Sequence, residues 1–401
     1  MTETRKEAAR LGPWTYPHLF LSGFVARLPY GIAAVGLLTA GTQRGYPPGI
    51  TGLLPTAFTV ALALATPWWG RGADRYGMRR VLLPCAVITV LGATTAALAP
   101  TAGIALIGAA LIGVGCPPIT AMMRTIWIWL LPDPDSRRRA MTWESIAAEG
   151  VHIIGRILTA GVSLLSARIS LLLLGVFGLT GSALLIGNPH TADIRPAISR
   201  PNLAVLSHSR ARRLLLLTVL LMSSGHGAAA TALIGNPHGP SAGAALMAIW
   251  GVGSAIGGAI YLRSSSAHST PVRTVRVGLV VFLVLCPLAA ATLSAQWSLA
   301  AASVLVLGIP LAPTSTGIYL EAADLAAPGR ETETNALVTS AVVIGFGIGT
   351  AATGFAEGLS TPVSGGLTAA ALFTLAAVLT HLFLPRIGKP PSPASGESAP
   401  S

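Results

Sequence analysis

Long apolar runs separated by short polar segments are the main pattern of this 401-residue chain. Each run holds roughly the 20 mostly apolar residues that a helix needs to cross the hydrocarbon core of a bilayer. The sequence therefore predicts an all-α membrane protein with twelve transmembrane helices, near residues 18–41, 49–69, 81–99, 102–130, 141–166, 168–188, 214–235, 242–262, 277–294, 298–320, 334–358 and 363–385.

Polar segments group these predicted helices into two bundles. A basic, proline-containing segment follows the sixth run, and the end of the chain is rich in Pro, Ser and Gly, a composition typical of disorder. We expect five regions, which are an N-terminal tail (1–17), an N-terminal six-helix bundle (18–188), a linker (189–213), a C-terminal six-helix bundle (214–385) and a disordered tail (386–401).

The two bundles align when the chain is shifted by 193 residues. At this offset the Gly-Cys-Pro at 115–117 falls on the Gly-Ile-Pro at 308–310, and Arg80 falls on Arg273, with no gap. Two parallel six-helix repeats joined by a polar linker are an architecture of secondary transporters. Chance similarity between helices rich in Gly, Ala and Leu is the alternative.

Composition excludes a water-soluble protein. Only 10% of the residues are charged and 52% are hydrophobic, whereas soluble domains carry about 25% charged residues. The net charge of +12 is spread over seven short segments between apolar runs, so we expect no nucleic-acid partner. Cys85, Cys116 and Cys286 are isolated in apolar runs and lack the spacing of metal ligands or disulfides, so no cofactor is predicted.

The distribution of lysine and arginine predicts the orientation, because cytoplasmic loops carry an excess of both. Of the 26 such residues, 21 fall on one side of the predicted spans and only Arg44 and Arg168 fall on the other. We therefore expect both tails and the linker to lie in the cytoplasm, with the helices in the lipid bilayer of the cell membrane. We also expect the protein to be a monomer. The first run is too long for the apolar part of a signal peptide.

One segment between the second and third runs concentrates charge. Gly70 to Arg80, GRGADRYGMRR, holds four arginines and one aspartate. It resembles the signature loop of the major facilitator superfamily, G-x-x-x-D-R-x-G-R-[RK], with Met78 shifting the last arginines by one place. The matching residues are Gly70, Asp74, Arg75, Gly77, Arg79 and Arg80. The resemblance covers residues 18–385 and implies the fold of that superfamily, similar to actinobacterial carriers that export drugs or metabolites.

The chemistry of this segment suggests more than a membrane-facing loop. A sharp turn between two helices favours Gly72 and Gly77, and arginines suit an anionic membrane face. Topology does not require Asp74. The resemblance implies that Asp74 meets the N-terminus of the eleventh helix, near Glu331–Asn335, where the helix dipole is positive. We hypothesise that the six matching residues form a conformational latch; a plain topology-setting loop is the alternative.

Charges inside predicted spans are functional candidates because they are costly at membrane depth. In the fifth run, spacings of three and four place Glu149, His152 and Arg156 on one helix face, and Arg27 lies at similar depth in the first run. We expect Arg27 or Arg156 to pair with Glu149. Three roles remain open: a structural ion pair, proton exchange at Glu149, or direct binding of substrate.

Two further features concern the interior. His226 in the seventh run either lines a central cavity or is a packed, satisfied histidine. The fifth run carries Arg156 where many antiporters of the superfamily carry proline, which weakens an antiporter assignment. Prolines predict helix kinks in the fourth and tenth runs, at Pro117, Pro118, Pro310 and Pro313.

The function that fits these features is a secondary transporter that exports a small amphiphilic molecule, such as a drug, antibiotic or metabolite. Its expected partners are that substrate, the bilayer and, as candidate coupling ion, the proton. An importer with the same fold is the alternative. A membrane-embedded enzyme is disfavoured, because the sequence has no metal signature, nucleophile motif or paired carboxylates on facing repeats.

Overall fold

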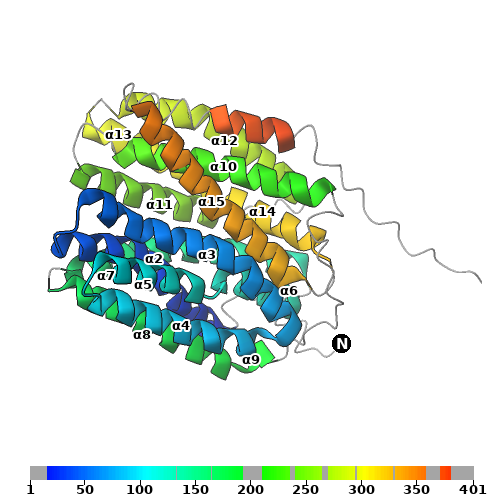
Figure 1. The fold of residues 1–401 in the computed structure, drawn as a ribbon. Helices are drawn as coiled ribbons and strands as arrows, with labels where there is room; N and C mark the ends of the chain where they lie inside the picture. The colour runs from blue at the N-terminus through cyan, green and yellow to red at the C-terminus, as the bar shows by residue number, and fades with distance from the viewer. Residues whose placement is uncertain are drawn as a thin grey trace, which may run out of the picture.

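A computed structural model of the chain is shown in Figure 1. It describes residues 16–131, 133–163, 165–192, 210–234, 240–263, 270–293, 296–327, 330–357 and 371–380. Within these ranges every regular element is a helix. The boundaries of the five expected regions stay predictions, because both tails and most of the linker lie outside the described residues.

The first half of the molecule is built from the helices before the linker. They are α2 (Pro17–Gln43), α3 (Pro48–Tyr76), α4 (Met78–Leu98), α5 (Ala102–Gly115), α6 (Ile119–Leu130), α7 (Pro134–Ser163), α8 (Ala167–Gly187) and the single turn α9 (Pro189–Ala192). The second half follows the linker. Its helices are α10 (Arg210–Ile234), α11 (Pro240–Arg263), α12 (Pro271–Thr292), α13 (Trp297–Gly308), α14 (Leu311–Leu325), α15 (Glu331–Glu357) and a last helix, Ala371–Thr380.

The predicted all-α membrane fold is confirmed. Eleven helical stretches of the described chain are long and apolar enough to cross a membrane, with α5–α6 and α13–α14 each counted as one stretch. Of the twelfth predicted span, only Ala371–Thr380 is described. Large apolar side chains such as Leu64 and Trp68 are 65% and 68% exposed, as expected for helices whose outer faces contact lipid.

Prolines interrupt the same helix in each half. The fourth predicted span breaks between α5 and α6 at Cys116–Pro118, and the tenth breaks between α13 and α14 at Ile309–Pro310. Proline lacks the N–H that an unbroken helix would use and its ring displaces the preceding turn. The two breaks are 193 residues apart, so the repeat seen in the sequence is also a repeat in backbone geometry.

Glycines let neighbouring helices approach closely. A side chain at Gly345 or Gly349 of α15 would collide with the backbone of α10, and one at Gly253 or Gly257 of α11 would collide with the α13 region. Small residues four apart favour this kind of packing in membranes because dispersion forces, rather than hydrophobicity, hold such helices together. Each half encloses apolar clusters of its own.

The halves meet along one interface, in which α3 and α6 pack against α15, and α7 packs against α11 and α14. In Figure 1, α15 begins beside the ends of α3 and α6 and then crosses obliquely over α10. We call this end of the bundle, where α3 ends and α15 begins, the Asp74 end. The sequence predicts that it is cytoplasmic.

Candidate functional site

The charged segment at 70–80 is mostly helix rather than the expected loop. Helix α3 runs through Tyr76 and α4 starts at Met78, so the turn is made by Gly77 alone. Its backbone has φ of 89° and ψ of 148°, a conformation that is open essentially only to glycine. Gly72, expected to help the turn, is instead helical, and its missing side chain leaves room for Val81.

Asp74 lies at the N-terminus of α15. Its Oδ1 accepts a hydrogen bond of 3.1 Å from the Thr332 N–H, and its Oδ2 accepts one of 2.7 Å from the Glu333 N–H. The first N–H groups of a helix have no partner within the helix and carry partial positive charge. A carboxylate of the first half therefore caps a helix of the second half.

Two neighbours of Asp74 reinforce this contact. Gly70 lies so close to α15 that a Cβ there would be 2.7 Å from the Cβ of Ala336. Arg71 forms an ion pair with Glu333 through its Nε, and its guanidinium also lies over the Trp68 ring, 5.4 Å from the centroid. Glycine thus permits the approach of α3 to α15, while charge holds it.

The other arginines of the segment face elsewhere. Arg79 donates to the Asn188 carbonyl at 2.8 Å and to the Thr191 hydroxyl at 3.2 Å, which ties α4 to the end of α8 within the first half. Arg75 and Arg80 are exposed. Of the six matching residues, Asp74 and Gly70 therefore contact the second half directly, while Gly77 forms the turn and Arg79 anchors α4 to the end of α8.

Hydroxyl groups add to the interface between the halves near the same end. Thr332 donates to the Thr125 hydroxyl of α6 at 3.1 Å. Ser340 of α15 donates to the Ala63 carbonyl of α3 at 3.0 Å. The contacts around Asp74 are thus part of a longer polar seal between α15 and the first half.

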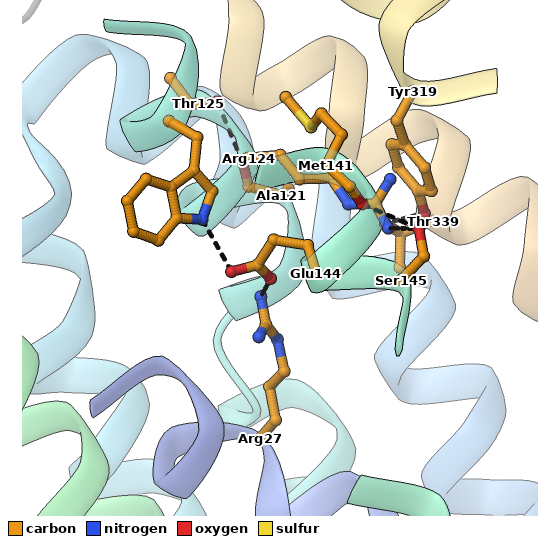
Figure 2. Close-up of polar contacts among 10 residues, drawn as sticks. Arg27, Ala121, Arg124, Thr125, Met141, Glu144, Ser145, Tyr319 and Thr339 are labelled. Carbon is orange, nitrogen blue, oxygen red and sulfur yellow. Dashed lines mark hydrogen bonds and ion pairs between the residues drawn. The ribbon is translucent and has the colours of Figure 1, made fainter. Parts of the chain in front are cut away.

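A buried cluster of charges lies deeper in the first half (Figure 2). Arg27 of α2 forms an ion pair with Glu144 of α7, and the other carboxylate oxygen accepts a 2.7 Å hydrogen bond from the Trp127 indole. Glu144 is fully buried and Arg27 is 2% exposed. The sequence predicted that Arg27 or Arg156 pairs with Glu149. The structure places Glu144 beside Arg27, about 15 Å along α7 from its first residue.

Arg124 of α6 lies across the interface from the second half. Its guanidinium carbon is 3.1 Å from the centroid of the Tyr319 ring of α14, and its Nη2 is 3.4 Å from the Ser145 hydroxyl. The Ser145 hydroxyl is in turn 3.4 Å from that of Thr316 on α14. Figure 2 shows Arg124 between α6 and the Tyr319 side chain.

The remaining predicted site residues are only partly placed. Glu149 and Arg156 belong to α7, but their side chains lie outside what the structure describes, so their predicted pairing stays a prediction. His152 is exposed on the same helix. His226 lies in neither group of charges.

His226 is buried in an aromatic cluster of the second half. It is 8% exposed, and its ring stands edge-on to Phe282 and Phe373 at centroid distances of 4.8 and 5.1 Å. Its Nε2 has no hydrogen-bond partner among the described residues. The packing alternative for His226 is supported by these contacts, although the ring is not fully satisfied.

Sequence reasoning missed the contacts that cross between helices. Arg124 was visible as a charge inside a span, but nothing in its own helix indicated Tyr319 as a partner. Glu144 was visible in the fifth run, but it does not share the face chosen for Glu149. The signal that could have found them is the cost of burying an arginine, which requires some partner within reach.

Comparisons with known proteins agree with this architecture. The profile of the Major Facilitator Superfamily matches residues 19–260, which is more than half of the chain. No curated protein matched the sequence.

Solved transporter structures share the fold over nearly the whole chain. The human organic anion transporter TETRAN superposes with a TM-score of 0.71 at 18% identity, covering 91% of this chain and 98% of that one. A bacterial homologue of the iron transporter ferroportin, in an outward-facing state, gives 0.71 at 14% identity with the same coverage. The E. coli fucose:proton symporter FucP gives 0.69 at 17% identity, also covering 91% and 98%.

Proposed function

The chain belongs to the Major Facilitator Superfamily, and we propose that it is a secondary carrier that moves a small organic molecule across the bilayer by alternating access. The family and the fold identify a multi-pass membrane transporter and not an enzyme.

The observation that carries the proposal is the cap that Asp74 places on α15. Both of its carboxylate oxygens accept backbone N–H groups from the opposite half, and charge-assisted bonds of this kind are about twice as strong as neutral ones. A contact between halves at one end must break if that end is to open. We infer that this arrangement is the state closed to the cytoplasm, with Asp74 as its latch.

We further propose export of an amphiphilic drug, antibiotic or metabolite. Only 10% of the residues are charged, which suits an amphiphile better than a sugar or a phosphate ester. Import by the same fold is the alternative, and vesicles of defined orientation decide between them. Actively pumped substrate accumulates in inside-out vesicles if the protein exports and in right-side-out vesicles if it imports.

Proton coupling is the third part of the proposal, and α7 supplies its candidates. Glu149 can alternate between the charged and neutral forms only if its surroundings permit both. Of the two carboxylates Glu144 and Glu149, Glu144 has the structural role, because it forms an ion pair with Arg27 and accepts a hydrogen bond from Trp127. We expect Glu149→Gln to abolish pH-driven accumulation while exchange of substrate persists, as measured by counterflow in reconstituted vesicles.

The test of the latch is Asp74→Asn. This change keeps the shape of the side chain but removes its charge and one acceptor, so at least one bond to α15 is lost. A hydrogen bond to a charged group contributes about 1.5–3 kcal/mol, so we expect transport to fall by about tenfold or more at normal abundance in the membrane. Transport is measured by counterflow in reconstituted vesicles. The probes are fluorescent naphthalene derivatives that carry an acetate, an acetamide or an ethylammonium group.

Asp135→Asn is the matched control. Asp135 begins α7 at the same end, its side chain is 55% exposed, and its ion pair with Arg138 lies within one helix. An exposed pair of this kind contributes little, so this variant should transport normally. Equal transport by Asp74→Asn and the wild type, at equal abundance, would reduce the segment to a topology signal.

A further inference from the structure

Two guanidinium groups but only one carboxylate are placed in the buried cluster of Figure 2. Arg27 and Arg124 are each 2% exposed, and the carboxylate of Glu144 is taken by Arg27. Among the described residues, Arg124 has a hydrogen bond to the Ser145 hydroxyl and a cation–π contact with the Tyr319 ring, and the carboxylate of Glu144 attracts it without forming an ion pair with it. A buried charge without a counterion is strongly destabilising, so the second positive charge requires a function.

The unused donors of Arg124 indicate what kind of partner is missing. Its Nε and Nη1 are buried and have no hydrogen-bond partner among the described residues. A guanidinium presents five N–H donors in a planar fork, which matches the oxygens of a carboxylate, sulfonate or phosphate. The Ser145 hydroxyl, 3.4 Å from Nη2, engages only one of these nitrogens.

The internal repeat shows that the fold itself does not need these charges. Shifting by 193 residues takes Arg27 to Leu220, Arg124 to Gly317 and Glu144 to Leu337. At these three positions the second half carries uncharged residues. Arg124 is therefore not required by the arrangement of helices that the two halves share.

The place of Arg124 links binding to the transport cycle. The guanidinium belongs to α6 of the first half, and the Tyr319 ring that covers it belongs to α14 of the second half. Separation of the halves at the Asp74 end would remove the ring and free the face of the guanidinium. Closure would return an aromatic face, which stabilises a cation in the absence of an anion.

We propose that Arg124 binds the anionic group of the transported molecule, so that the substrate is an amphiphilic organic anion. The carboxylate or sulfonate displaces Tyr319 from the guanidinium when the Asp74 end is open, and Tyr319 covers the empty site when that end closes. This assignment rests on the proposed transport function and deepens it by naming the substrate class.

Binding to purified protein in nanodiscs is the direct test. The probes are naphthalene acetate, its amide and naphthyl ethylammonium, which share one ring system and differ in charge. The wild type should bind the acetate about tenfold or more tightly than the other two, since only the acetate offers the guanidinium a charged acceptor. Arg124→Gln should abolish this preference, and Arg124→Lys, which keeps the charge but not the planar fork, should retain part of it.

Arg44→Gln is the matched control. Arg44 donates to the carbonyls of Ala96 and Ala97 at 2.9 and 2.6 Å, where it neutralises the end of α4, and its replacement should leave the preference for acetate intact. Equal binding of the three probes to the wild type, or no binding of the acetate, would overturn the proposal.

The melting temperature without ligand separates a binding role from a structural one. An arginine that waits for an anion is an unpaired buried charge, so Arg124→Gln should melt no lower than the wild type. A clear drop would mean that Arg124 is structural and would overturn the proposal. If adding Glu149→Gln restores the melting temperature of Arg124→Gln, Glu149 is an internal counterion of Arg124. That result would also overturn the proposal.

Failure of this proposal is distinguishable from failure of the transport function. If the wild type exchanges the amide or the ammonium probe in counterflow but not the acetate, the transport function is supported and the anion site at Arg124 is overturned. If the acetate binds through Arg124 but none of the probes is exchanged, the anion site is supported and transport of these amphiphiles is contradicted.

Discussion

The two halves of the molecule share a frame but not a distribution of charge. Each half breaks one membrane helix at prolines, at Cys116–Pro118 and at Ile309–Pro310. Each also has a groove on its outer surface, of about 540 Å³ in the first half and about 490 Å³ in the second. The grooves are lined at equivalent positions, by Trp68 and Arg80 in one and by Tyr261 and Arg273 in the other.

The interiors of the two halves differ, although their helix breaks and outer grooves lie at equivalent positions. The first half contains the ion pair of Arg27 with Glu144 and the guanidinium of Arg124. In the second half, the described core around His226 is aromatic and apolar. The comparison teaches that the repeat supplies the shared arrangement of helices, whereas Asp74, the ion pair and Arg124 occur in the first half alone. The second half buries a different charge, Glu321 of α14, which is 3% exposed.

The largest expected effect comes from breaking the ion pair of the first half. Glu144→Gln leaves Arg27 buried without a counterion, and removal of one partner from a buried pair costs about 3–5 kcal/mol. We expect a much lower melting temperature and poor expression, measured on detergent-purified protein.

The second half suggests the compensating variant. It carries Leu220, Leu320 and Leu337 at the positions equivalent to Arg27, Trp127 and Glu144. Replacement of all three by leucine should recover most of the lost stability, because replacing a buried ion pair together with its partners by apolar residues is often close to neutral. If the triple variant is as unstable as Glu144→Gln alone, the ion pair of Arg27 with Glu144 is required for the stability of the first half.

An intermediate effect is expected at Gly70, where the halves touch most closely. Gly70→Ala would place its Cβ 2.7 Å from that of Ala336, and overpacking of this kind costs about 1–3 kcal/mol. We expect the closed Asp74 end to be weakened and counterflow to be altered. Gly52→Ala is the control in the same helix, since a Cβ there meets nothing within 4 Å. Equal behaviour of the two variants would contradict the tight approach of α3 to α15.

The smallest effect is expected from Ser340→Ala, which gives α15 the residue that the first half carries at the equivalent position, Ala147. The change removes one neutral hydrogen bond, to the Ala63 carbonyl, with a net contribution of about 0.5–1.5 kcal/mol. Transport should change by less than in Gly70→Ala, and the melting temperature only slightly. A larger loss than for Gly70→Ala would show that the hydroxyl, and not the close approach, holds the interface.

The sequence by itself determined the membrane helices, the internal repeat and the segment that carries Asp74. These follow from properties that are local or periodic along the chain, such as apolar runs of sufficient length and prolines inside them. The same reasoning placed Arg27 at membrane depth and required a partner for it. It also located α15 as the helix whose N-terminus faces Asp74, through resemblance to a known family.

Only the tertiary structure decided which charges meet. Periodicity places residues on a face of one helix, but it does not fix how far two helices are shifted along each other. Helix α2 contacts α7 through Gly31 and Gly155, and side chains lean toward the start of their helix. This offset puts the guanidinium of Arg27 beside Glu144. The contact of Arg124 with Tyr319 likewise depends on how the two halves dock, which no pattern within either half specifies.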